Sequence, residues 1–274
     1  MTQHDLPNFD DYLFDAKSEL KSFATRYSGP LGDDELRELR NDEYRRLDDL
    51  QEQLYAEKKQ SLLIVLQAMD AAGKDSSIAR LTRRLNAQGC LVHSFKKPTD
   101  LELAHDFLWR VHQKAPSQGE IALFNRSHYE DVLIVKVHGW ADAKTIEQRY
   151  AHINAFESLL ADRGTQVLKF MLNISPEYQL SRFRSRLENS EKHWKFNPGD
   201  LDERQHWDAY MDAFQIAMQK CSSSAAPWYV VPAENRRFRD FMLARIVADK
   251  LQTMSPEYPE PDFELDQYPP DQLV

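Results

Sequence analysis

Short apolar segments alternate with longer stretches of helical periodicity along most of this chain. Within each apolar segment nearly every position is hydrophobic, which is typical of strands buried on both faces of a parallel sheet. The alternation of strands and helices predicts an α/β fold, in which helices cover both faces of the sheet and form a three-layer sandwich. The five expected strands cover residues 62–66, 91–95, 121–124, 167–174 and 228–231.

A long charged segment before the first strand has the pattern of one helix over residues 33–59. Asp33 is placed to act as its N-cap, and leucines recur along one face. This helix either covers the sheet or forms a subunit interface. The leucines of the apolar face are Leu36, Leu39, Leu47, Leu50 and Leu54.

Two later helices have clear start signals. Thr99 and Glu102 form a capping box for one helix, while Ser175 and Pro176 provide the N-cap and the first position of the other. The apolar face expected for the first of these helices consists of Leu101, Ala104, Leu108 and Val111.

The chain is expected to form one large domain with two appendages. The domain covers residues 61–254, and an extension over residues 1–60 carries the long helix. A Pro-rich acidic tail over residues 255–274 is expected to wrap the surface or to be disordered. Hydrophobic residues make up 42% of the 274 residues, which is enough for a sizeable core.

Charge and cysteine content exclude several classes of protein. The formal net charge of −9 argues against nonspecific nucleic-acid binding, so any polyanion would need a local basic patch. Cys90 and Cys221 have no spacing typical of a disulfide framework or a metal site. We find no signal peptide and no apolar run long enough to cross a membrane, so we expect a cytoplasmic protein without membrane contact.

The stretch LLIVLQAMDAAGKDSSI, residues 62–78, has the strand–loop–helix order of a phosphate-binding P-loop. It departs from the common GxxxxGK[ST] pattern, because Ala68 replaces the first glycine and Asp75 replaces the Ser or Thr, with Ser76 one position later. Asp70 lies within the loop, where a carboxylate would repel phosphate unless a cation lies between them. Asp70 is therefore predicted to bind Mg²⁺. The alternative is an ordinary turn in which Asp70 caps the next helix.

Polar residues follow the second and third expected strands. In a parallel sheet these carboxyl ends lie at one edge, next to the P-loop. Arg126 suits bidentate contact with phosphate, and Glu130 and Asp131 offer carboxylates to Mg²⁺ or to an acceptor. Lys96 and Lys97 form either a phosphate contact or part of a solvated loop.

A basic patch follows the fourth expected strand in RFRSRLENSEKHWKF, residues 182–196. Arg182 and Arg186 share a helix face, and such like charges are unfavourable unless an anion neutralises them. The patch is typical of the lid that P-loop kinases close over phosphates, although Glu188 and Glu191 offer a salt-bridged surface as the alternative. Its basic residues are Arg182, Arg184, Arg186, Lys192 and Lys195.

Together these stretches resemble the family-2 polyphosphate kinases, P-loop phosphotransferases that move phosphoryl groups between inorganic polyphosphate and nucleotides. The resembling stretches are MDAAGKDSSI, SFKKPT, HDFLWRVH, GEIALFNRSHYEDVLIVKVHG, RLENSEKHWKFNP and APWYVVPA. The resemblance implies a thymidylate-kinase-like P-loop kinase fold, with a central five-stranded parallel sheet and a mobile lid at about residues 182–200 of a phosphotransferase domain. It also implies dependence on Mg²⁺ and a homo-oligomer, either a dimer or a tetramer.

The second motif suggests which acceptors are used. Relatives often read FDRSWYN there, whereas this chain reads FNRSHYE over residues 124–130. Asn125 removes one candidate acid, which Glu130 and Asp131 can replace. This form resembles the subgroup that accepts both nucleoside mono- and diphosphates.

We therefore expect phosphoryl transfer from polyphosphate to AMP or ADP, with guanine nucleotides as further possible acceptors. Two alternatives stay open: an ATP-dependent nucleoside monophosphate kinase, and a nucleotide-binding regulatory protein without catalysis. Asp70 and Asp131 are the expected Mg²⁺ ligands. The expected catalytic residues are Asp70, Lys74, Arg126, Glu130 and Asp131; phosphate is assigned to Ala72, Gly73, Lys74, Asp75, Ser76, Arg182, Arg186 and Lys192; and the nucleotide is assigned to Lys97, Asn125 and Arg126.

Overall fold

The computed structural model describes residues 6–269 and contains a six-stranded sheet in the order β1-β6-β5-β2-β4-β3. Five strands are parallel, as the sequence predicts, and β1 pairs antiparallel with β6. The sequence analysis missed β1 because its two residues are too few to form a pattern. The strands are β1 Leu13–Phe14, β2 Ser61–Gln67, β3 Cys90–Ser94, β4 Ile121–Asn125, β5 Thr165–Asn173 and β6 Trp228–Pro232.

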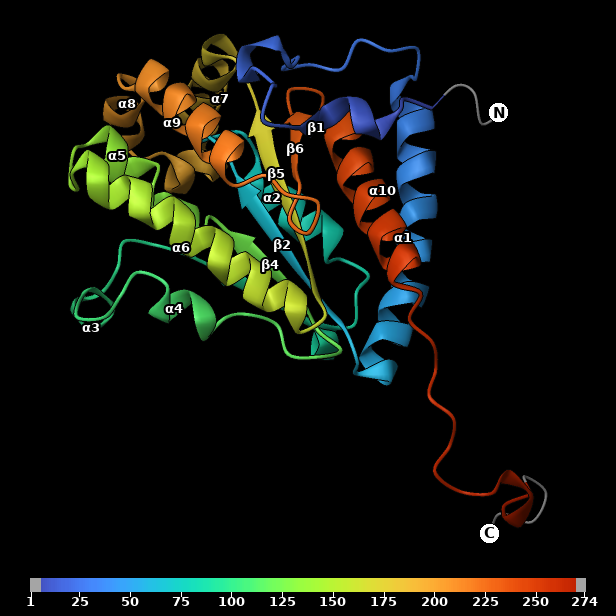
Figure 1. The fold of residues 1–274 in the computed structure, drawn as a ribbon. Coiled ribbons are helices and arrows are strands. Elements are labelled where there is room, and N and C mark those ends of the chain that lie inside the picture. The colour runs from blue at the N-terminus through green and yellow to red at the C-terminus, as the bar shows by residue number, and fades with distance from the viewer. Residues whose placement is uncertain (1–5, 270–274) are drawn as a thin grey trace.

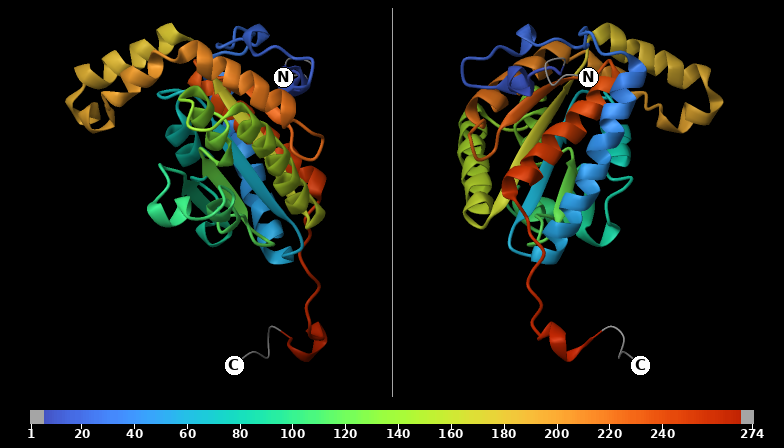
Figure 2. Two further views of the ribbon diagram at one scale, coloured as in Figure 1. Left: turned by 60° about the vertical axis from the view of Figure 1, so that its left-hand side comes forward. Right: turned by 90° about the vertical axis from the view of Figure 1, so that its right-hand side faces the viewer.

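Helices cover both faces of the sheet (Figures 1 and 2). Strand β2 is buried along its whole length, and its side chains alternate between two separate cores. Leu62 and Ile64 pack with α1 and α10, whereas Leu63 and Val65 pack with α6 and α9. The helices that flank the sheet are α1 Asp33–Glu57, α2 Lys74–Leu81, α5 Ile134–Val137, α6 Ala143–Asp162, α9 Trp207–Lys220 and α10 Arg236–Met254.

Helix α1 packs beside α10, and its leucines face the core that includes β2 (Figure 1). Of the two alternatives for this helix, packing within the domain is therefore confirmed. The predicted N-cap is wrong by one residue. Gly32 is the N-cap, Asp33 is the first helical residue, and the Glu35 carboxylate accepts a hydrogen bond from the Gly32 N–H at 2.8 Å.

The helix expected over residues 99–111 is two short helices, α3 Asp100–Leu103 and α4 Trp109–His112. The capping box of Thr99 and Glu102 is present. However, the Asp106 carboxylate accepts a hydrogen bond from the Leu108 N–H at 3.0 Å, and this local turn interrupts the helix. As a result Leu101 is exposed, whereas Val111 is buried.

A helical arm projects from the three layers (Figure 2). It consists of α7 Pro176–Glu188, a 3₁₀ segment Ser190–Lys195 and α8 Gly199–Arg204. The start of α7 is as predicted: the Ser175 hydroxyl accepts a hydrogen bond from the Tyr178 N–H at 3.2 Å, and proline occupies the first turn. The lid expected at about residues 182–200 lies within this arm.

The chain after α10 leads away from the body (Figure 1). Pro256 is buried and Tyr258 lies beside Glu52 of α1, and the later part of the described tail, up to residue 269, extends away from the body. The last five residues lie outside the described part. Across residues 6–269, no helix has the length and apolar character that crossing a bilayer requires.

Candidate active site

The loop between β2 and α2 has the backbone geometry of an anion-binding turn. Ala71 and Gly73 have φ angles of 65° and 108°, in the left-handed region. A Cβ atom at Gly73 would lie 2.1 Å from the Arg239 guanidinium, so this position requires glycine. No side chain caps the first turn of α2, whose N–H groups are therefore available to an anion.

Lys74 is buried at the base of this loop. Its Nζ donates hydrogen bonds to the carbonyl oxygens of Ala68 at 2.8 Å and Met69 at 3.3 Å. An ammonium group has three N–H donors, so one donor remains for a ligand. Burial lowers the pKa of Lys74, and the nearby Asp70 opposes this shift only in part. Lys74 thus combines a fixed position with one unused donor.

Asp70 and Arg126 form an ion pair of 2.8 Å between the loop and the end of β4. The two strands are neighbours in the sheet, which brings their carboxyl ends together. Arg126 has a φ angle of 60°, a strained backbone conformation of the kind found at functional sites. Burial alone would raise the pKa of Asp70, but Lys74 and Arg126 outweigh it, so the pKa is lower than usual and the carboxylate is charged.

The polar residues after β4 point to different places. Asn125 donates a hydrogen bond to the Asp75 carboxylate at 2.6 Å, which links the end of β4 to the first turn of α2. Ser127 caps the following 3₁₀ turn, His128–Asp131, in which Glu130 and Asp131 diverge. Glu130 lies at the site, and burial raises its pKa.

Asp131 is not brought to the P-loop. Its carboxylate lies 3.5 Å from the Arg149 guanidinium, and Asp131 lines neither of the two cavities that flank Asp70. The structure therefore does not bring Asp131 together with Asp70, as the predicted pair of Mg²⁺ ligands would require. The reason is the tight turn, which directs adjacent side chains apart.

The larger cavity beside Asp70, which we call the P-loop cavity, has a volume of about 610 Å³. It contains every P-loop residue that the sequence assigned to phosphate, together with Asn125, Arg126 and the lid cations Arg182, Arg186 and Lys192. Lys96 lines this cavity and Lys97 does not, so the nucleotide assignment of Lys97 is not supported. Ten cationic side chains line it: Lys74, Arg80, Lys96, Arg126, Arg182, Arg186, Lys192, Lys195, Arg236 and Arg239.

The smaller cavity, which we call the Asp70 cavity, has a volume of about 230 Å³ and shares Asp70 and Arg126 with the P-loop cavity. Its wall is partly apolar, with Leu133, Ile134 and Phe214. Its polar residues include four carboxylates and one cation: Asp70, Glu130, Asp200, Glu203 and Arg126. The two cavities thus have opposite charge and meet at one ion pair.

Comparison with known proteins assigns the chain to a family. The family model described as polyphosphate kinase 2 matches residues 31–259, which is most of the chain. The chain belongs to the polyphosphate kinase 2 family. The matched residues include α1, strands β2 to β6, the lid and α10.

Individual relatives agree with this assignment. The chain is 48% identical to the AMP/ADP-polyphosphate phosphotransferase of Meiothermus ruber, over 80% of this chain and 82% of that protein. It is 42% identical to the ADP-polyphosphate phosphotransferase of Rhodopseudomonas palustris, over 81% of each. The crystal structure of polyphosphate kinase 2 from Arthrobacter aurescens TC1 superposes with a TM-score of 0.92 at 39% identity, covering 94% of this chain and 93% of that one. The P-loop kinase fold predicted from the sequence is confirmed.

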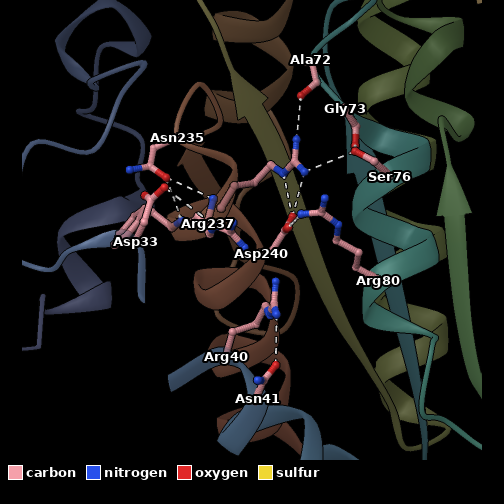
Figure 3. A network of polar contacts seen from close by, with 12 residues as sticks. Asp33, Arg40, Asn41, Ala72, Gly73, Ser76, Arg80, Asn235, Arg237 and Asp240 are labelled. Atoms are coloured by element: carbon pink, nitrogen blue, oxygen red, sulfur yellow. Dashed lines mark hydrogen bonds and ion pairs between the residues drawn. The ribbon is translucent and has the colours of Figure 1, made fainter. Parts of the chain in front are cut away.

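In this family member, a buried arginine on α10 supports the P-loop. Arg239 donates hydrogen bonds to the Ala72 carbonyl and the Ser76 hydroxyl, both at 3.2 Å. The Asp240 carboxylate accepts a hydrogen bond from Arg239 at 2.8 Å. Asp240 also forms an ion pair with Arg80 (Figure 3). The sequence analysis missed Arg80, Arg236 and Arg239. The arginines of α10 follow the end of β6, so the rule used for the other strand ends would have found them.

The donor set at the Asp70 cavity fits Mg²⁺. Asp70 and Glu130 both offer carboxylate oxygens there. Protein Mg²⁺ sites often use one or two carboxylates together with phosphate oxygens and water. Across the described residues no group of three or more His, Cys, Asp or Glu is arranged to hold a metal. A bound Mg²⁺ would therefore depend on oxygens from a substrate.

Proposed function

We propose that this protein transfers phosphoryl groups from inorganic polyphosphate to AMP and ADP, forming ADP and ATP. The observation that carries this proposal is the meeting of two oppositely charged cavities at Asp70 and Arg126. A linear polyanion suits the cation-lined P-loop cavity. A nucleotide suits the Asp70 cavity, whose wall is partly apolar. The names of the relatives support the same pair of substrates.

Positioning and charge neutralisation account for most of the catalysis in such a transfer. The unused donor of Lys74 and the N–H groups at the start of α2 hold the transferring phosphate. A phosphate oxygen of the acceptor forms a bond to the phosphorus of the transferring phosphate. At the same time, the bond between that phosphorus and the bridging oxygen of the donor breaks. The donor leaves as a polyphosphate shorter by one unit. Arg126 lies between the cavities and orients the acceptor phosphate.

Asp70 and Glu130 hold Mg²⁺ in this proposal. Bound there, the ion would neutralise negative charge on the phosphoryl oxygens. Asp70 keeps its charge because its pKa is lower than usual, which suits a metal ligand at neutral pH. Asp131 has no part in this set, since it pairs with Arg149.

Closure of the arm over the donor excludes water and prevents hydrolysis. Arg186 donates a hydrogen bond to the Lys195 carbonyl at 2.9 Å and lies 3.3 Å from Asp200, so the two sides of the arm are tied together. The arm thus carries Arg182 and Arg186 as one unit.

Four expectations stay predictions of the sequence. They are the use of guanine nucleotides, assembly into a dimer or tetramer, a cytoplasmic location, and the division into an extension, a phosphotransferase domain over 61–254 and a tail.

One incubation tests the proposed reaction. The protein is supplied with Mg²⁺, AMP and polyphosphate without ATP, and products are separated by ion-exchange chromatography. We expect ADP first and then ATP. Transfer to AMP only when ATP is the donor would indicate a nucleoside monophosphate kinase instead. Binding of nucleotide without turnover from either donor would indicate a regulatory protein.

A further inference from the structure

A second basic cavity lies at the N-terminus of α10. It has a volume of about 320 Å³ and is lined by Arg26, Arg80, Arg236 and Arg237, together with Asp33 and Glu234. We call it the α10 cavity. Arg26 comes from the segment before α1, and its backbone pairs with Ala233 just after β6. Elements far apart in the sequence therefore bring four arginines to one place.

The α10 cavity continues the P-loop cavity. Arg80 and Arg236 line both of them. Asp240 holds Arg80 at the boundary and also binds Arg239, which supports the P-loop (Figure 3). A row of cations thus leads from Lys74, past Arg80 and Arg236, to the far side of the α10 cavity.

The two acids of the α10 cavity offset only part of the charge of its four arginines. The Glu234 carboxylate accepts a hydrogen bond from the Ser175 N–H at 2.8 Å, and Asp33 lies 3.8 Å from Arg237. Within residues 6–269, the side chains of Arg26 and Arg236 form no ion pair within 4 Å. Arg182 has a lowered pKa because of burial and then because of Arg236, so the excess positive charge extends to the boundary with the lid.

We propose that the α10 cavity is a distal subsite for the donor, which binds phosphate units of a long polyphosphate behind those in the P-loop cavity. This inference rests on the proposed function. A polyphosphate repeats the same charge along its length, so a continuous row of arginines can bind successive units without sequence or shape recognition. A short donor occupies the P-loop cavity alone, whereas a long donor also reaches Arg26 and Arg237.

The test is the double variant Arg26→Gln/Arg237→Gln, assayed with two donors. One is the shortest polyphosphate that the unmodified protein uses, and the other is a long-chain preparation. We expect kcat/KM for the long donor to fall roughly tenfold, the scale of losing two partly exposed ionic contacts. With the short donor kcat/KM should change less than about twofold. The long-donor KM of the variant should also depend less on salt.

Arg45→Gln is the matched control, because Arg45 is exposed on α1 and pairs only locally with Asp42. It should leave both donors unchanged. Equal losses with both donors, or no loss with either, would overturn the distal subsite. Binding of the long polyphosphate without nucleotide, followed by calorimetry, separates this inference from the proposed function. If the unmodified protein transfers nothing but binds polyphosphate, weaker binding by the double variant supports the subsite and unchanged binding overturns it.

Discussion

The P-loop cavity and the Asp70 cavity share two residues and differ in almost everything else. The P-loop cavity has ten cationic side chains and two carboxylates, whereas the Asp70 cavity has four carboxylates and one cation. The first draws its residues mainly from the P-loop, α10 and the part of the arm formed by α7 and the 3₁₀ segment. The second lies between the P-loop, the turn after β4, α9 and the α8 part of the arm. Their only shared side chains are Asp70 and Arg126.

This difference shows how one site can treat two phosphate-bearing substrates differently. A donor made of identical charged units needs charge and length, whereas an acceptor needs an apolar wall and a few placed polar groups. Against the effect of burial, Glu130 and then Asp70 raise the pKa of Arg126, and Lys74 and then Arg126 lower that of Asp70, so both members of the pair are charged. The ion pair therefore acts as the boundary between the two cavities.

The strongest way to break the comparison is Lys74→Ala, which removes the cation closest to the boundary on the donor side. Turnover should fall by about 10²- to 10³-fold, the scale of losing one preorganised stabiliser. The measurement is the initial rate of ADP formation from AMP and saturating polyphosphate. Thermal melting serves as the control, because Lys74 also tethers the Ala68 and Met69 carbonyls. Turnover near that of the unmodified protein would remove this loop from the chemistry.

The variant Asp70→Asn tests the boundary from the acidic side. Turnover should fall by about 10²-fold, because the amide keeps the shape but loses the charge assigned to Mg²⁺. Asp131→Asn is the matched control and should retain most activity, since Asp131 pairs with Arg149 outside both cavities. If Asp131→Asn were the more damaging change, the metal assignment would have to be exchanged.

The loss of thermal stability in Asp70→Asn, relative to the unmodified protein, should depend on pH. The pKa of Asp70 is lower in the folded protein than in the unfolded chain, so its ion pair stabilises the fold above the unfolded pKa and is lost as pH falls through the folded pKa. Asp70→Asn should therefore melt slightly earlier than the unmodified protein at neutral pH, and the difference should shrink in acid. Thermal melts across the acidic range measure it. A difference that is independent of pH would contradict the assigned ion pair.

The donor side beyond the boundary depends on the arm. Replacing Arg182 and Arg186 together by Gln should weaken polyphosphate binding about tenfold and reduce its salt dependence, because fewer charge contacts remain to be screened. Binding of AMP alone should change much less, and calorimetry with each ligand measures both. Comparable losses for the two ligands would indicate that Arg182 and Arg186 contribute to acceptor binding as well, and their assignment to the donor side would no longer hold.

The sequence predicted the sheet and its motifs because both follow from local pattern. Long apolar runs indicate buried parallel strands, and residues after such strands must meet at one edge, as Asp70 and Arg126 do. Which of two adjacent residues lines a cavity did not follow from the sequence. Lys96 lines the P-loop cavity and Lys97 does not. Of the two adjacent carboxylates, Glu130 lines the Asp70 cavity and Asp131 lines neither cavity. Neighbouring side chains point in different directions, and tight turns set which one faces the site, so spacing alone cannot choose between them.

Local sequence patterns also did not predict contacts between segments that are distant in the sequence. Arg239 supports the P-loop from a helix more than 160 residues later, through hydrogen bonds to Ala72 and Ser76. Its sequence signal, a cluster of arginines after β6, has the same form as any charged helix start. The break between α3 and α4 depends on one hydrogen bond made by Asp106, which competes with a helix-compatible pattern.

The smallest expected effect concerns the choice between AMP and ADP. It tests the assignment of the Asp70 cavity to the acceptor. The two acceptors differ by one phosphoryl unit, so one site can serve both only if something holds either phosphate within reach of the donor. Glu130 is the acid of the Asp70 cavity that comes from the turn after β4, and burial raises its pKa, so a bound cation would favour its charged form. Glu130→Asn should lower AMP phosphorylation several-fold more than ADP phosphorylation. Glu130→Gln keeps the length without the charge, and a similar change in the AMP-to-ADP rate ratio for both variants would assign the effect to charge. An unchanged ratio in both would exclude Glu130 from acceptor choice.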